Sequence, residues 1–130
     1  MAEDTVTSTR AEAGLDSPHR LIASNRVEGT AVYDRRGDKL GRIEYFMVDK
    51  VTGQADYAVM SFGGLFGLGH KHYPLPWDML EYDPAQGGYV VDLDKDRLEK
   101  GPSFEAGQEP SFDRSYDQRV HDYYGVIYTW

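Results

Sequence analysis

Short runs of β-prone residues alternate with turn residues along most of the chain. Six such runs follow one another from residue 27 onward: VEGTAVYD, KLGRIEYFMVD, QADYAVMSF, HKHYPLPW, MLEYD and GYVVDL. No helical pattern intervenes between them, and dense, regular strands of this kind are typical of a small antiparallel sandwich or barrel. The pattern therefore predicts an all-β fold built from six antiparallel strands.

Glycines mark the turns between these runs. Gly37, Gly53 and Gly88 each close a short polar turn, and a type I turn followed by a left-handed glycine is a favoured link between antiparallel strands. Gly41 interrupts the alternation of the second run, so we predict a β-bulge there that bends the strand, as a small barrel requires. Gly63 and Gly64, after the third run, complete the set of predicted structural glycines.

Two short helices are predicted after the strands. Residues 94–102, DKDRLEKGP, begin with aspartates and end with lysine, glycine and proline, which indicates one or two helical turns with caps. Residues 105–118 are polar and interrupted by proline, so we expect a linker. Further on, Tyr116, Val120 and Tyr123 or Tyr124 fall at helical spacing, and Gly125 can end a short helix in the aromatic tail.

Charge divides the chain into three parts. The net charge is −8. Residues 1–18 are acidic and short of large apolar side chains, which predicts a flexible acidic arm. Residues 19–104 are nearly neutral and form the predicted barrel domain, whereas residues 105–130, the linker and tail, are acidic again. Because acidic ends repel a phosphate backbone, nucleic-acid binding is disfavoured.

The composition also limits the chemistry and the compartment. The chain has no cysteine, so it forms no disulfide and no thiolate zinc site, and it suits a reducing compartment. No secretory signal pattern opens the chain, and no stretch of eighteen apolar residues occurs. We therefore expect a cytoplasmic protein without a membrane span.

Several of these segments together resemble the PRC-barrel family, and most of all its short stand-alone bacterial members. The likeness covers roughly residues 19–104 and is carried by LIAS and VEGT (residues 21–24 and 27–30), GDKLGRIE (37–44), VDKVTG (48–53), YAV before SFGG (57–64) and LPW (75–77). The resemblance implies a six-stranded barrel followed by a short helix. It also implies kinship with the cytoplasmic domain of the photosynthetic reaction centre H subunit and with a domain of the ribosome maturation factor RimM, in which the barrel contacts other proteins and has no catalytic machinery.

The glycine-rich stretch from Ser61 to Leu80 does not predict a phosphate or metal site. A phosphate loop needs lysine and a hydroxyl residue after its last glycine and must open a helix, but histidines intervene and two prolines, Pro74 and Pro76, follow. His70 and His72 share one face of a strand, yet a zinc centre needs three or four ligands. We therefore assign no catalytic, cofactor-binding or metal-binding residue and expect no enzyme and no cofactor.

The remaining candidates are large apolar side chains in loops and tail. They form either plain core or an interface with a second subunit or partner. The candidate interface residues are Phe62, Leu65, Phe66, Leu68, Trp77, Tyr123, Tyr124, Ile127, Tyr128 and Trp130. The main hypothesis is a non-enzymatic adaptor that binds protein partners through apolar loops and sheet edges as a homodimer.

Two alternatives remain open. One is a small-ligand or metal sensor with a pocket at the barrel end, lined by Tyr57, His70, His72 and Tyr73. The other is an RNA- or ribosome-associated factor, which follows from the likeness to RimM and is opposed by the charge.

Overall fold

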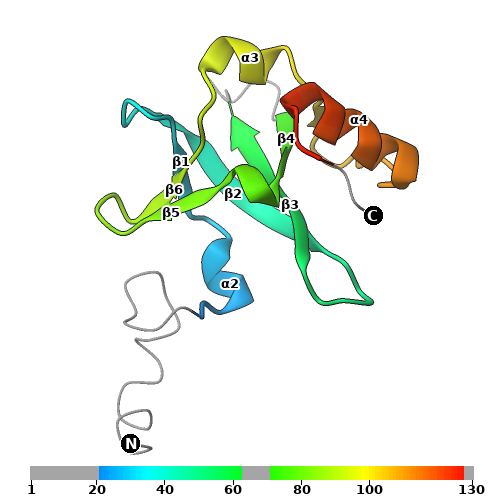
Figure 1. The fold of residues 1–130 in the computed structure, drawn as a ribbon, viewed down its shortest axis with the longest axis horizontal. Helices are drawn as coiled ribbons and strands as arrows, with labels where there is room; N and C mark the ends of the chain where they lie inside the picture. The colour runs from blue at the N-terminus through cyan, green and yellow to red at the C-terminus, as the bar shows by residue number, and fades with distance from the viewer. Residues whose placement is uncertain (1–20, 63–70, 128–130) are drawn as a thin grey trace, which may run out of the picture.

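The computed structural model describes residues 21–62 and 71–127 (Figure 1). In chain order its elements are α2 (Ser24–Val27), β1 (Ala31–Tyr33), β2 (Lys39–Val48), β3 (Ala55–Phe62), β4 (Lys71–Pro76), the 3-10 helix η3 (Trp77–Met79), β5 (Glu81–Asp83), β6 (Gly88–Val90), α3 (Lys95–Glu99), β7 (Phe104–Glu105) and α4 (Arg114–Tyr124). Each of the six predicted runs contains one strand, so the β-rich class is confirmed.

The strands form a single seven-stranded sheet in the order β5-β6-β1-β2-β3-β4-β7. Neighbours are antiparallel except β1 and β6, which run parallel, with Val32 opposite Tyr89. The prediction of a purely antiparallel sheet is therefore wrong at this pair. It arises because the chain crosses over after β4 and brings the β5–β6 hairpin back beside the first strand.

The two edges of the sheet, β5 and β7, do not pair with one another within the described residues. The sheet is therefore open, and the closed six-stranded barrel of the prediction is not observed.

The seventh strand, β7, is only two residues long and lies at the start of the segment expected to be a linker. A run this short leaves no alternating pattern in a sequence, so periodicity could not reveal it.

Bulges bend the long central strands. In the pairing of β1 with β2, Val32 lies opposite Gly41 and Tyr33 opposite Lys39, so Leu40 is the extra residue. The predicted bulge is thus present, one residue before Gly41. Further register shifts fall at Glu44 in β2 and at Asp56 in β3, and each increases the local twist and curl of the sheet.

Turn chemistry agrees with the sequence at two of the predicted glycines. Gly37 and Gly53 have φ of 90° and 81°, in the left-handed region that favours glycine. In the third turn Gly87, not Gly88, has the positive φ, of 68°. Gly88 is needed for a different reason, since a Cβ there would lie 2.5 Å from the carbonyl oxygen of Ala31. Gly63 and Gly64 lie outside the described residues.

Both predicted helices are present and capped. Asp94 begins α3 by accepting a hydrogen bond from the Arg97 amide. Gly125 ends α4 with φ of 71°, as the helical spacing of the tail predicted. Helix α4 begins at Arg114, however, so it takes in part of the segment that was expected to be a linker.

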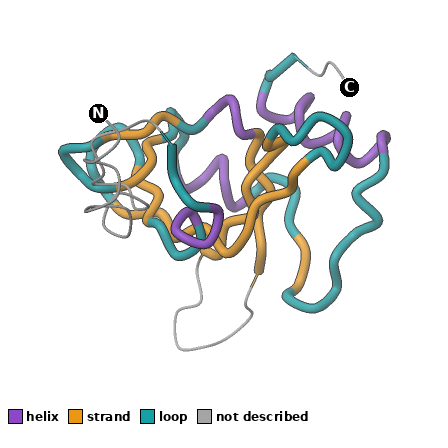
Figure 2. Tube along the Cα trace, turned by 90° about the horizontal axis from the view of Figure 1, so that it is seen from below, coloured by secondary structure: helices purple, strands orange, loops and turns teal. Residues whose placement is uncertain are grey.

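The core lies inside the curl of the sheet and continues beneath the C-terminal helix. Figure 1 shows α4 beside β4, at the end of the sheet away from the β5–β6 hairpin. Figure 2 shows the C-terminal helix flanking the strands. Residues of β3 from Tyr57 to Met60 are all buried, which means that both faces of this strand are covered. The largest fully buried side chains are Val32, Ile43, Tyr57, Val59, Met60, Pro74, Leu75, Pro76, Val91, Leu98 and Val120.

Among the described residues no helix is long and apolar enough to cross a membrane.

Candidate interaction site

Six aromatic rings join the C-terminal segment to the outer face of the sheet. We call them the aromatic cluster: Tyr45, Tyr57, His72, Phe104, Phe112 and Tyr116. Phe112 is at its centre, with ring centroids 5.7 Å from Tyr57, 6.0 Å from Phe104 and 5.7 Å from Tyr116. His72 extends the cluster, with its ring 5.6 Å from Phe104 and 6.1 Å from Tyr45. The cluster therefore links β2, β3, β4 and β7 to α4.

Phe112 reaches this position through an unusual backbone. Its φ of 55° makes it the one non-glycine residue with positive φ among those described. An aromatic residue has an energetic cost in this region, which the surrounding rings offset by burying its side chain. The strain therefore marks the point where the chain turns from the sheet into α4.

The start of α4 follows directly from the sequence beside Phe112. Asp113 caps the helix by accepting a hydrogen bond from the Tyr116 amide at 2.9 Å. Together with hydrogen bonds from Ser111 and Ser115, this contact holds the pKa of the Asp113 carboxyl below its usual value. Phe112, just before the cap, contacts Tyr116 in the first turn and so helps to fix the direction in which the chain enters the helix.

A reciprocal clamp fixes the far end of α4 to α3. Arg97 donates to the Tyr123 carbonyl oxygen at 2.7 Å, and the Tyr123 hydroxyl donates to the Arg97 carbonyl oxygen at 2.6 Å. The Arg97 guanidinium also lies over the rings of Tyr123 and Tyr124, 5.5 and 5.8 Å from their centroids. Cation–π contacts of this kind add modest stability at exposed sites.

Polar atoms are buried beneath α4 without hydrogen-bond partners among the described residues. They are the hydroxyl oxygens of Tyr45, Tyr57, Tyr116 and Tyr124, Nδ1 of His72 and Oδ1 of Asp117. Burial raises the pKa of Tyr116 to about 12 and raises the pKa values of Tyr57 and Tyr124 as well. A buried polar atom without a partner weakens an interface, so α4 is held by its rings in spite of these groups.

The described interface candidates pack largely on this chain itself. Phe62 is half-buried against Tyr73, and Trp77 lies between Phe46 and Tyr89. Tyr124 is buried and Tyr123 belongs to the clamp. Tyr124 is thus part of the core, and Phe62, Trp77 and Tyr123 are partly buried against it.

Ile127 differs from the other described candidates. It is 83% exposed and lies three residues after Tyr124, the last residue of the docked helix. The candidates Leu65, Phe66, Leu68, Tyr128 and Trp130 lie outside the described residues.

The residues proposed to line a sensor pocket are not brought together. Tyr57 and Tyr73 are both buried in the core, and His70 lies outside the described residues. Only His72 lines a hollow, of about 510 Å³, which it shares with Lys39, Leu40, Gly41, Arg42, Glu44, Ser61, Phe62, Lys71 and Ala106. In the part of the chain that the structure describes, no three His, Asp or Glu side chains gather as a metal site would require.

Glu44 and Arg42 form an ion pair within this hollow, with Nε of Arg42 3.3 Å from the Glu44 carboxylate. A hydrogen bond from Ser61 is the largest cause that lowers the pKa of Glu44, and Arg42 and His72 lower it further. The hollow therefore contains acidic as well as basic groups.

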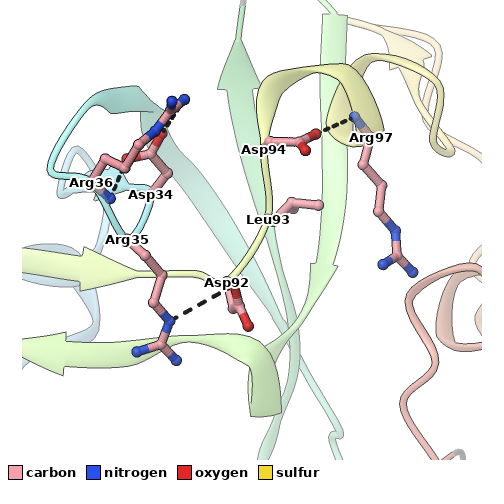
Figure 3. A pocket seen from close by; sticks show the side chains of 7 residues that line it. All are labelled: Asp34, Arg35, Arg36, Asp92, Leu93, Asp94 and Arg97. Carbon is pink, nitrogen blue, oxygen red and sulfur yellow. Dashed lines mark hydrogen bonds and ion pairs between the residues drawn. The ribbon is translucent and has the colours of Figure 1, made fainter.

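A second pocket, of about 400 Å³, lies between the β1–β2 turn and the start of α3. Figure 3 shows Arg35 directed at Asp92 and Arg36 directed at Asp34, at N–O distances of 3.9 and 3.8 Å. Arg97 points away from these residues toward its clamp with Tyr123. Because its cations already face carboxylates or the clamp, this pocket is a balanced polar surface.

Sequence reasoning missed the residues at the centre of the site, Phe112 and Asp117. Phe112 lies directly before the Asp113 cap, but a hydrophobic staple needs an apolar residue at the fourth helical position, and that position is Asp117. Asp117 had no signal either, because a single acidic residue in a helix is usually solvent-exposed.

A curled and bulged β-sheet with a helix packed beside it defines a small β-rich domain. The chain matches the PRC-barrel domain family over residues 19–98, well over half of its length. It belongs to the PRC-barrel domain family, as the sequence resemblance predicted.

Among solved structures, the chain is similar to a protein described as a 16S ribosomal RNA processing protein, RimM, from Pseudomonas aeruginosa. The two share 24% sequence identity with a TM-score of 0.38, over 57% of this chain and 44% of that one. The chain thus spans less than half the length of this relative. No match is found among curated proteins.

Proposed function

We propose that the chain is a non-enzymatic protein-interaction module of the cytoplasm, which forms a homodimer and presents apolar side chains to a partner. The observation that carries this proposal is the position of Ile127. Helix α4 is fixed at both ends, yet Ile127, three residues after its last residue Tyr124, is 83% exposed. PRC-barrel domains are generally non-catalytic and generally mediate protein interactions, which agrees with this role.

The proposed contact is the apolar terminal segment, residues 127–130. Its sequence, IYTW, joins Ile127 to Tyr128 and Trp130, and aromatic residues are enriched where interfaces concentrate their binding energy. The clamp between Arg97 and Tyr123 reduces the entropy that α4 would lose on binding. A pre-ordered helix of this kind can present a short apolar segment at little conformational cost.

The edges of the described sheet favour side-chain contacts over strand addition. The edge strands β5 and β7 are three and two residues long, and β4 carries Pro74 and Pro76 where β7 no longer covers it. Proline has no amide hydrogen to donate, so it limits pairing with a further strand. We therefore assign the contact to apolar residues rather than to sheet edges.

Replacing Ile127 with aspartate should weaken self-association. A charge in the apolar contact would have to lose its water on binding, so we expect the dimer to shift to monomer at tens of micromolar. Light scattering during size-exclusion chromatography measures the mass. Val51→Asp is the matched control, because Val51 is 89% exposed at the β2–β3 turn and lies outside the proposed contact. A monomeric unmodified chain, or equal effects of the two substitutions, would contradict the proposal.

Small-ligand sensing is the second candidate function, favoured by the hollow of about 510 Å³ beside His72. A ligand that binds only the folded chain raises its melting temperature by mass action. A thermal-shift screen with metal ions and small metabolites therefore separates a sensor from an adaptor.

The third candidate, RNA association, is opposed by the net charge of −8. Retention on RNA that weakens with salt would support it.

A further inference from the structure

Helix α4 packs beside β4 and reaches the neighbouring strand β3 through an acidic side chain. Asp117 lies on the buried face of the helix and is only 6% exposed. It faces Asp56, the bulged residue of β3, and the neighbouring Tyr57. A carboxyl group is seldom buried so fully without a charged or hydrogen-bonding partner, so this contact calls for a physical explanation.

The surroundings of Asp117 do not fully satisfy an ionised carboxylate. Its Oδ1 and the Tyr57 hydroxyl are both buried without a hydrogen-bond partner among the described residues. The two groups face each other, and the Tyr57 hydroxyl favours the charged form of Asp117, but burial outweighs this contribution. A charged Asp117 would therefore lack much of the solvation that water gives it in the undocked helix.

Burial is the main cause that raises the pKa of Asp117, from the ordinary 3.8 to about 6. The Tyr57 hydroxyl and His121 act in the opposite direction, whereas Asp56 raises the pKa further because a second carboxylate nearby disfavours a second negative charge. His121 is itself 5% exposed, and its Nδ1 lies 2.8 Å from the Asp117 carbonyl oxygen.

Other ionisable groups also surround the docked helix. Those that face it from the elements packed against it are Tyr45 of β2, Asp56 and Tyr57 of β3, Tyr73 of β4 and Arg97 of α3, with Tyr116, Arg119 and His121 on α4 itself. Glu109 lies next to Tyr45. Burial raises the pKa values of Tyr45, Tyr57, Tyr73 and Tyr116, so these hydroxyls stay neutral near neutral pH, whereas the raised pKa of Asp117 lies closer to that range.

We propose that α4 is a proton-linked latch, in which a proton held by Asp117 beside Asp56 tightens the docking of α4 on the sheet, and loss of that proton loosens it. Undocking would uncover Tyr57 and the rest of the aromatic cluster on the sheet. This device adds regulation to the proposed interaction module, but it depends on the docking of α4 on the sheet and stands whether or not Ile127 binds a partner.

The direction of the effect follows from linkage. Because the docked state raises the pKa of Asp117, docking is strongest below about pH 4 and weakens as the pH rises through about 6. Between pH 5 and pH 7.5 this shift corresponds to a change on the order of tenfold in the docking equilibrium.

Hydrogen exchange of the α4 amides tests the latch in the full-length chain. After correction for the intrinsic pH dependence of exchange, protection of residues 114–124 should fall about tenfold from pH 5 to pH 7.5. In Asp117→Asn, which cannot ionise, protection should be nearly independent of pH over this range. Asp122→Asn is the matched control, because Asp122 is an exposed aspartate on the same helix and should keep the behaviour of the unmodified chain.

Three other results of these measurements would contradict the proposed latch. A pH dependence that persists in Asp117→Asn would show that a group other than Asp117 causes the effect. Protection that is constant or rises with pH in the unmodified chain would show that no such linkage exists. If Asp117→Asn does not fold, carbon NMR of the unmodified chain decides the matter, since an Asp117 carboxyl that titrates below pH 4.5 would disprove the proposal.

Discussion

Deleting residues 105–130 should leave a β-sheet domain that is unstable and prone to aggregate. The deletion removes Phe112, Tyr116, Val120 and Tyr124, which pack against the core, and it exposes Tyr57 on the sheet. Since burial of one large apolar side chain contributes about 1.5–3 kcal/mol, the loss should reach roughly 5–10 kcal/mol. A small domain is stable by only about 5–15 kcal/mol in total, so most of the folded population should be lost.

Urea denaturation followed by circular dichroism measures this loss, and light scattering reports aggregation. Deletion of residues 127–130 alone is the control, because it keeps α4 intact and removes from the described residues only the exposed Ile127. We expect that shorter deletion to unfold at nearly the same urea concentration as the full chain. If the chain without residues 105–130 were as stable and as soluble as the full chain, the docking of α4 would contribute nothing to stability and our interpretation would be wrong.

Replacing Gly41 with alanine should be the most damaging of the small substitutions. A Cβ at this position would lie 2.0 Å from the Ser61 carbonyl oxygen, which belongs to the backbone of β3 and is held in the sheet. The strands would have to separate next to the bulge at Leu40. Overpacking of a core commonly costs 1–3 kcal/mol and occasionally more, and we expect a cost of about 3 kcal/mol or more here.

Gly53→Ala separates this clash from the general cost of losing a glycine. Gly53 has φ of 81° and open space around its missing Cβ, so only the strain of the left-handed backbone applies, at about 1–2 kcal/mol. Chemical denaturation of both variants gives the comparison. Equal losses at the two positions would show that β2 and β3 can separate freely at Gly41, contrary to the close packing described above.

Local chemistry explains why much of the fold could be predicted. Gly37 and Gly53 indicate turns, because a positive φ is costly for other residues. Asp94 and Gly125 indicate helix ends, because helix ends need capping groups. Each of these signals depends on a few neighbouring residues. They are therefore visible in the sequence without knowledge of what packs where.

Contacts between distant segments explain what could not be predicted. The parallel pairing of β1 with β6 depends on how the chain crosses over after β4, and no pattern within either strand encodes it. Strand β7 exists only because Lys71 and His72 provide a partner for Phe104 and Glu105. The candidate site has the same origin, since Tyr57 and Phe112 meet although they are far apart in the chain.

The β-rich class, the family, the two C-terminal helices and the positions of most turns follow from the amino-acid sequence, because propensity, caps and left-handed glycines act over a few residues. The open sheet and the packing of α4 on it depend instead on contacts between distant segments. The burial of Asp117 beside Asp56 has the same origin. Burial and the electrostatics that follow from it are properties of the neighbours a side chain acquires in space, and those neighbours come from elsewhere in the chain.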